Sequence, residues 1–179
     1  TGALELPQEL DMSQSQSQIV LVGRPDGWVE EGHFALESAP LPQLADGQLL
    51  LRHHFLSVDP YMRGRMNDVK SYVPPFQIGE PIVSGGVAEV IESRLEGWEP
   101  GNFVAGMLPW TEFSAMPAEG LRKLPKTKAP LSWHLGILGM PGMTAYVGLI
   151  EVARCQPGDS VFVYAAAGAV GSVVGQIAR

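Results

Sequence analysis

The last part of the chain, DSVFVYAAAGAVGSVVGQIAR from Asp159 to Arg179, restricts the fold more than any other stretch. Val161–Tyr164 is a short apolar run, typical of a strand that is covered on both faces. Small residues follow it, and then a helical pattern carried by Val173, Val174 and Ile177. The sequence therefore predicts a strand, a tight turn and a helix at this end of the chain.

The turn between these two elements has the spacing of a phosphate-binding loop. The pattern G-x-G-x-x-G appears with alanine in its first slot, and its candidate cofactor-binding residues are Ala166, Gly168, Ala169, Val170 and Gly171. Small residues let the backbone approach a pyrophosphate, and the helix N-terminus offers free N–H groups to an anion. The alternative interpretation is an ordinary strand-to-helix turn whose residues are small for packing.

Composition excludes several classes of partner. The 179 residues carry a net charge of −7 without a block of lysine or arginine, so we expect no binding to nucleic acid or to an anionic membrane. Cys155 is the single cysteine, which rules out an intrachain disulfide and a four-cysteine zinc site. The richest apolar stretch, 135–150, is interrupted by Pro141 and is too broken to span a membrane. We expect a cytoplasmic protein.

The composition and the apolar pattern of the sequence change along the chain. Residues 1–17 are polar and predict a flexible leader. Residues 18–130 hold short apolar runs separated by Gly and Pro, which predicts a compact antiparallel barrel. Within it, residues 49–56 read as a strand buried on both faces. Residues 131–179 predict linking helices, the first capped by Ser132, before the terminal unit.

Three motifs occur in order: LSVDPYMRGRM at 56–66, GMPGMTAY at 139–146, and PGDSVFVYAAAGAVGSVVGQIA at 157–178. Together they resemble the medium-chain dehydrogenase/reductase superfamily. More narrowly, the chain resembles its zinc-free branch of prostaglandin/leukotriene reductases, plant double-bond reductases and bacterial curcumin reductases. The resemblance covers residues 19–179, about the first half of a typical member.

This resemblance implies a mixed α/β fold, in which a GroES-like β-barrel precedes a Rossmann domain that is truncated after its first β-α unit. The chain is then expected to be an incomplete fragment of a protein that is a homodimer when full length. Members of the family use NADPH to reduce the carbon–carbon double bond of α,β-unsaturated ketones and aldehydes. The expected partner is therefore a small-molecule enone.

The resemblance also suggests site residues. In similar proteins the MPGMTAY segment lines the nicotinamide pocket, which makes Met140, Met143 and Thr144 cofactor-binding candidates. Tyr61 would stand at the mouth of the substrate pocket and donate a hydrogen bond to the carbonyl oxygen. The alternatives are a capping role for the first segment and, around Tyr61, a barrel loop held by an ion pair between Asp59 and an arginine.

We expect no metal site. Zinc-dependent relatives use cysteine and histidine ligands, whereas this chain has Ser57 and Glu80 in the corresponding regions. His53 and His54 are adjacent on a strand and point to opposite faces, so they cannot chelate one ion together. Two other functions stay open: a quinone oxidoreductase of the same superfamily, and a non-catalytic nucleotide-binding protein on the same scaffold.

Overall fold

A computed structural model describes residues 15–71 and 73–179. All strands of this part lie before residue 124, with η1 and α1 between them. They are β1 (Ser15–Leu21), β2 (Phe34–Pro40), β3 (Gln48–Leu56), β4 (Val83–Ser93), β5 (Phe103–Pro109), β6 (Phe113–Pro117) and β7 (Arg122–Lys123). The helical segments are η1 (Glu31–His33), α1 (Tyr61–Arg65), η2 (Leu131–Leu135), α2 (Met140–Tyr146), η3 (Val147–Val152) and α3 (Gly171–Ile177).

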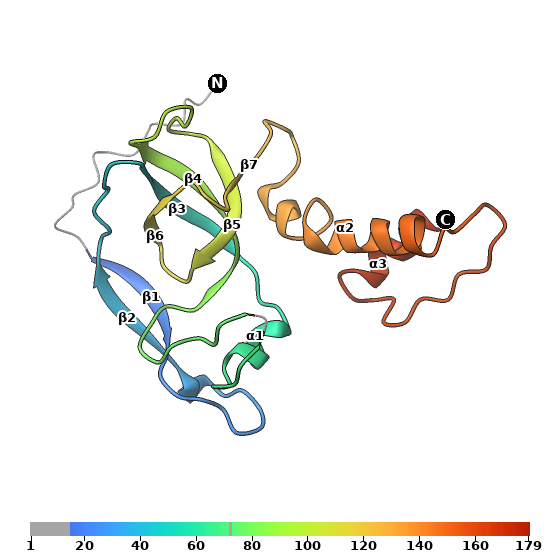
Figure 1. The fold of residues 1–179 in the computed structure, drawn as a ribbon, viewed down its shortest axis with the longest axis horizontal. Coiled ribbons are helices and arrows are strands. Elements are labelled where there is room, and N and C mark those ends of the chain that lie inside the picture. Colours follow the sequence, from blue (N-terminus) through green and yellow to red (C-terminus); the bar gives the residue numbers. More distant parts are fainter. Residues whose placement is uncertain (1–14, 72) are drawn as a thin grey trace.

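The strands form two antiparallel sheets (Figure 1). One sheet pairs β1 with β2, and the other has the order β6-β3-β4-β5-β7. The strand β3 lies inside the larger sheet, where Leu49, Leu50 and Leu51 are all buried. Successive residues of a strand point to opposite faces, so burial of three in a row confirms that this part of β3 is covered on both sides. For the rest of 49–56 the prediction is wrong, because Arg52, His54 and Phe55 are exposed.

Backbone hydrogen bonds join the two sheets. The N–H of Ile19 in β1 donates to the carbonyl of Trp110 at 2.8 Å, and the N–H of Ile82 donates to the carbonyl of Ile19 at 3.1 Å. Beneath this junction, Leu21 packs with Met62 of α1 in one apolar cluster. The chain is therefore an α/β structure in which antiparallel sheets dominate and helices are few.

The N-terminal boundary differs from the expectation for a leader over 1–17. The strand β1 begins at Ser15, and residues 1–14 lie outside the described part of the chain. Gln16 is 7% exposed, whereas Ser15 and Ser17 are exposed. The alternation of serine and glutamine thus follows the two-residue period of a strand, which the polar composition obscures.

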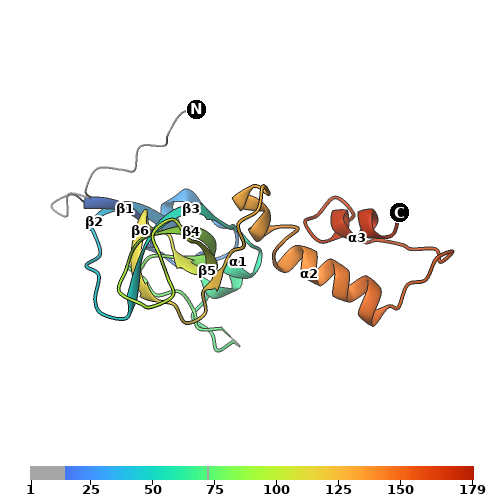
Figure 2. The same ribbon diagram turned by 90° about the horizontal axis from the view of Figure 1, so that it is seen from above.

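Helices α2 and α3 lie beside each other and extend away from the sheets (Figures 1 and 2). The helix α2 continues directly into η3, a π-type segment. None of the helices in the described residues is long and apolar enough to cross a membrane.

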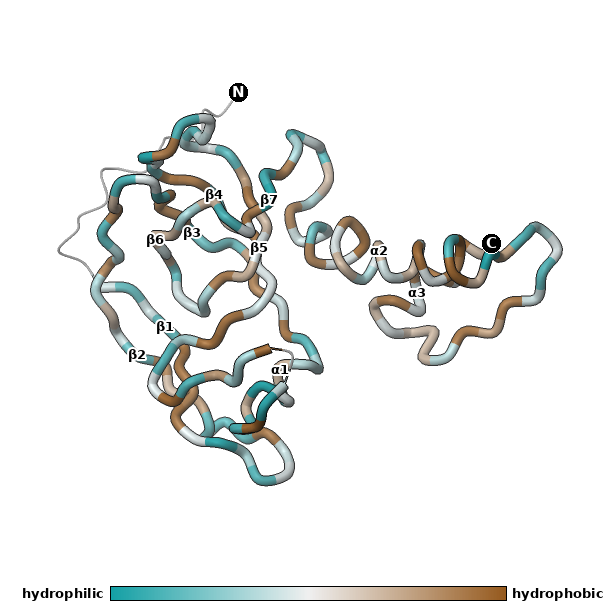
Figure 3. Tube along the Cα trace, in the orientation of Figure 1, coloured by the Kyte–Doolittle hydropathy of each residue, from teal (hydrophilic) through white to brown (hydrophobic). Residues whose placement is uncertain are grey.

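The segment at 161–164 differs from the prediction of a strand. It has no strand assignment, and Phe162 and Tyr164 are 85% and 88% exposed. Figure 3 shows this hydrophobic stretch in the open loop that leads to α3. A strand needs a neighbour to complete its ladder of hydrogen bonds, and the described residues place none beside this segment. Apolar composition alone therefore does not make this segment a strand.

The structure also differs from the prediction of a helix capped by Ser132. A short 3-10 turn spans Leu131–Leu135, and its N-cap is Pro130. Gly136 ends the turn with φ −118° and ψ −111°, which no helix can continue.

Candidate functional site

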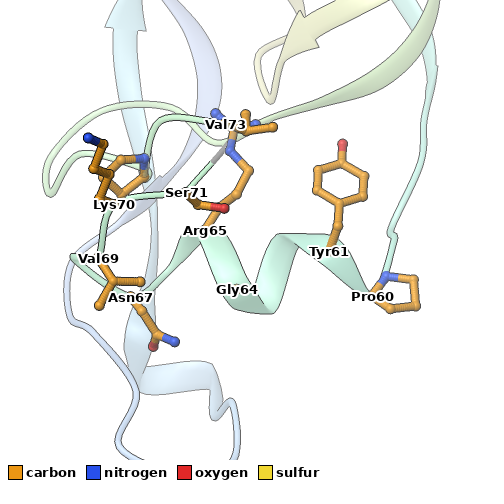
Figure 4. Close-up of a pocket in the computed structure, with 10 residues that line it drawn as sticks. Pro60, Tyr61, Gly64, Arg65, Asn67, Val69, Lys70, Ser71 and Val73 are labelled. Carbon is orange, nitrogen blue, oxygen red and sulfur yellow. The ribbon is translucent and has the colours of Figure 1, made fainter.

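A cavity of about 380 Å³ lies beside α1 (Figure 4). Tyr61 and Arg65 line it from the helix, and Lys70, Ser71 and Val73 line it from the segment that follows. Figure 4 shows the Tyr61 and Arg65 side chains on the same side of α1, as residues four apart on a helix should be. Tyr61 is 37% exposed, so its ring is open to a molecule that enters the cavity.

The sequence before α1 explains how Tyr61 is placed. Pro60 stands at the N-cap with φ −56° and ψ −33°, already in the helical region, and the N–H of Met62 donates to the carbonyl of Asp59 at 3.0 Å. The Asp59 carboxylate accepts a hydrogen bond from the Ser57 hydroxyl at 2.6 Å. The alternative of an Asp59–arginine ion pair is wrong, because the ion pairs of the described residues do not include Asp59.

Arginines hold the segment that follows α1. The Arg65 guanidinium donates to the carbonyl of Pro74 at 3.0 Å and lies 4.1 Å from the centre of the Phe76 ring. Arg24, from the loop after β1, binds carbonyls at both ends of the same segment. Sequence reasoning missed Arg24, because no motif surrounds it and only its contacts in the folded chain distinguish it.

The predicted phosphate-binding turn is tightly closed by its own backbone. The N–H of Gly168 donates to the carbonyl of Ala165 at 2.9 Å, and Ala165 has a φ of 52°, in the left-handed region. A Cβ on Gly171 would overlap the carbonyl oxygen of Ala165, so only glycine fits there. Residues 165–170 are exposed, so the turn lies at the surface of the described chain.

The other predicted cofactor residues share the helix α2. Met140, Met143 and Thr144 are all exposed, with exposed fractions of 76% and 61% for the two methionines. The helix itself packs closely, because a Cβ on Gly142 would overlap the carbonyl oxygen of Ile137. Since α2 contacts α3, these side chains belong to the same helical unit as the turn at 165–170.

The structure does not join the two groups of candidates into one cavity. Among the described residues, those that line the cavity beside Tyr61 fall within 60–71 and 73–75, and none belongs to α2, α3 or the turn before α3. Figures 1 and 2 both show α1 with the sheets and α3 beside α2, away from the sheets.

The histidines of the larger sheet have separate structural partners. A ring nitrogen of His53 lies 2.8 Å from the Ser114 hydroxyl, and one of His54 lies 3.2 Å from the Glu89 carboxylate. Burial lowers the pKa of His53 and is the largest influence on it. Among the described residues, no three His, Cys, Asp or Glu side chains come together as metal ligands would.

Residues 17–124 match the family described as the N-terminal domain of oxidoreductase. The chain belongs to this oxidoreductase family. The matched range begins in β1 and ends just after β7, so this N-terminal oxidoreductase domain corresponds to the two sheets and the segments between them.

Known oxidoreductases resemble the chain beyond this domain. It is 48% identical over 168 residues to a putative NADP-dependent oxidoreductase of Bacillus subtilis, covering 94% of the chain and 49% of that protein. It is 42% identical over 166 residues to the NADPH-dependent curcumin reductase of Escherichia coli, covering 93% and 48%. These relatives confirm the resemblance to the curcumin reductase branch that the three motifs predicted.

A solved structure shows the same relationship. The crystal structure of CurA from Vibrio vulnificus in complex with NADPH superposes with a TM-score of 0.83 at 44% identity, covering 90% of the chain and 48% of that protein. The chain thus spans about half the length of the curated relatives that it matches.

Proposed function

We propose that this chain is the N-terminal part of an NADPH-dependent reductase that acts on the carbon–carbon double bond of α,β-unsaturated ketones and aldehydes. The observation that carries the proposal is the 42% identity to an NADPH-dependent curcumin reductase over 93% of the chain. Curcumin contains such conjugated double bonds. The cavity beside Tyr61, in the matched oxidoreductase domain, supports the proposal, since a small enone could bind there.

In this proposal, residues 18–130 form a GroES-like barrel and residues 131–179 begin a Rossmann domain. The antiparallel sheets that end at Lys123 support the first assignment. The close backbone approach at Gly171, where α3 begins, supports the second, since the third glycine of a dinucleotide motif serves helix packing.

The residues of the helical unit fit a dinucleotide. Ala166, Gly168 and Ala169 lie at the surface without bulky side chains, so a pyrophosphate could approach their N–H groups, whereas Gly171 is buried where α3 begins. The exposed side chains of Met140, Met143 and Thr144 would contact the nicotinamide end. NADPH bound by these residues would supply the hydride for reduction of the substrate's β-carbon.

Tyr61 would stabilise the charge that this reaction places on the substrate oxygen. As the carbonyl becomes an enolate, a phenol hydroxyl at the cavity wall can donate a hydrogen bond that strengthens with the charge. The proton that completes the α-carbon would come from solvent or from a positioned side chain. We propose that no metal takes part, because Ser57 and Glu80 stand where zinc-dependent relatives have ligands. A cytoplasmic location and a homodimer stay predictions.

The direct test uses the full-length protein, NADPH and a panel of conjugated enones. We expect loss of NADPH absorbance and a product whose carbonyl is intact and whose double bond is saturated. Faster turnover of quinones than of enones would favour a quinone oxidoreductase. Tight NADPH binding without turnover of any acceptor would favour a non-catalytic nucleotide-binding protein.

A charge reversal tests the phosphate-binding turn. Ala169→Glu places a carboxylate at an exposed position of the turn, where it would repel a pyrophosphate. We expect the Kd for NADPH, measured by fluorescence titration, to rise about tenfold or more, which corresponds to a loss of about 1.4 kcal/mol. Gln176→Glu adds the same charge near the other end of α3 and should leave the Kd nearly unchanged. Equal effects of both variants would contradict the assignment.

A further inference from the structure

One arginine outside the three sequence motifs holds both ends of the segment that forms the cavity wall. The Nη1 group of Arg24 donates to the carbonyl of Met66 at 2.8 Å, and its Nη2 group donates to the carbonyl of Phe76 at 3.1 Å. Every lining residue after α1 lies between these two carbonyls, among them Lys70 and Val73.

The surroundings of these two bonds make them hard to replace. Met66 and Phe76 are 5% and 4% exposed, so water has little access to their backbones. The N–H of Phe76 also donates to the carbonyl of Arg65 at 2.8 Å, which ties the same two ends directly. Arg24 thus closes the neck of a compact surface loop whose described residues form one side of the cavity.

The planar guanidinium suits this task. It presents several N–H donors in a fixed fork, so one side chain can bind two carbonyl oxygens at a set separation. A lysine ammonium is a point charge on a flexible stem and lacks that fixed spacing. The ion pair of Arg24 with Asp68 is longer, at 3.9 Å, and the Asp68 side chain is 76% exposed, so the carbonyl bonds are the stronger contacts.

We propose that Arg24 is a positioning residue for substrate binding. By fixing the two ends of the segment after α1, it sets how far Lys70, Ser71 and Val73 stand from Tyr61, and so the width of the cavity. Arg24 does not line the cavity itself. It therefore acts through the wall, and its effect should depend on substrate size. The inference rests on the proposed function only in naming an enone as the occupant.

The first test measures the mobility of the cavity wall in the absence of substrate. In hydrogen–deuterium exchange of the full-length protein, we expect amides of residues 67–71 and 73 to exchange at least about tenfold faster in Arg24→Gln than in the wild type. Amides of β3 and β4 should stay unchanged. The matched control is Arg94→Gln, which removes the same charge from a half-exposed side chain. Within the described part of the chain, Arg94 forms ion pairs with Asp46 and Glu92, at 3.6 and 4.0 Å.

The second test separates positioning from general damage. With a bulky enone, we expect Arg24→Gln to raise KM about tenfold while kcat stays within about twofold, and with a small enone we expect little change in either. Arg24→Lys should restore KM only part of the way to the wild-type value, because one ammonium cannot reproduce the two spaced hydrogen bonds of the guanidinium. Asp68→Asn should match the wild type, since it removes only the long ion pair.

Three outcomes would overturn the inference. One is unchanged exchange and unchanged KM in Arg24→Gln. Another is faster exchange throughout the sheets with a parallel fall in kcat, which would mean that Arg24 merely stabilises the fold. A wild-type KM in Arg24→Lys would show that a positive charge at this position is enough to hold the segment. If the wild type turns over no enone, the proposed function fails, whereas the exchange experiment still decides the role of Arg24.

Discussion

His53 shows how burial of one side chain makes stability depend on pH. Burial lowers its pKa in the folded chain from the ordinary value of 6.5, so the unfolded chain binds a proton more readily. The stabilisation is complete above pH 6.5 and is lost as the pH falls below that value toward the folded pKa. We expect the midpoint of urea unfolding to decrease between pH 8 and pH 5.5, and to decrease less in His53→Gln.

His54→Gln is the matched control for this experiment, because it replaces the adjacent histidine and leaves His53 in place. It should keep the loss of stability at low pH. Part of the loss should also persist in His53→Gln, since burial and, secondarily, Arg122 lower the pKa of His134. An identical pH dependence in His53→Gln and the wild type would refute the assignment.

At the scale of an element, the start of α2 depends on close backbone contact. A Cβ on Gly142 would overlap the carbonyl oxygen of Ile137, and backbone atoms cannot move aside as a flexible side chain can. We expect Gly142→Ala to lower the free energy of unfolding by about 1–3 kcal/mol, as overpacking of a tight site does. Chemical denaturation of the full-length protein would measure it.

Gly148→Ala provides the control within the same continuous helix. Nothing lies within 4 Å of a Cβ at this position, so the substitution adds helix propensity without a clash. We expect a gain of up to about 1 kcal/mol. If Gly148→Ala destabilises as much as Gly142→Ala does, helix geometry rather than the contact with Ile137 is responsible.

For the molecule as a whole, the joining of the two sheets is the main constraint, and Gln16 contributes to it from within β1. Its side chain accepts a hydrogen bond from the N–H of Phe113 at 2.8 Å and donates one to the carbonyl of Pro40 at 3.3 Å. Removing it leaves these backbone groups without their partner. We expect Gln16→Ala to lower the free energy of unfolding by about 1–3 kcal/mol, measured by denaturant titration.

Gln18→Ala is the corresponding control, two residues along the same strand. Its side chain makes an exposed hydrogen bond of 3.3 Å to Glu37, and water can replace that bond. We expect a change within about 0.5 kcal/mol. Comparable losses in the two variants would mean that strand propensity, and not the bonds of Gln16 across the sheets, sets the effect.

The sequence by itself determined the features that depend on local chemistry. Gly and Pro spacing predicted short antiparallel strands, and three motifs predicted the oxidoreductase family. The predicted burial of 49–56 on both faces is correct for 49–51 only. Period, turn chemistry and motif spacing are properties of neighbouring residues, so they can be read without knowing the fold.

Only the tertiary structure decided the features that join distant parts of the chain. Arg24 and Gln16 carry no local signal, because their partners lie 24 to 97 residues away. The segment at 161–164 has the composition of a strand, yet it is not one here, because strand formation requires hydrogen bonds from a neighbour as well as apolar side chains. Those contacts exist only once the chain has folded, and no local pattern encodes which residue supplies them.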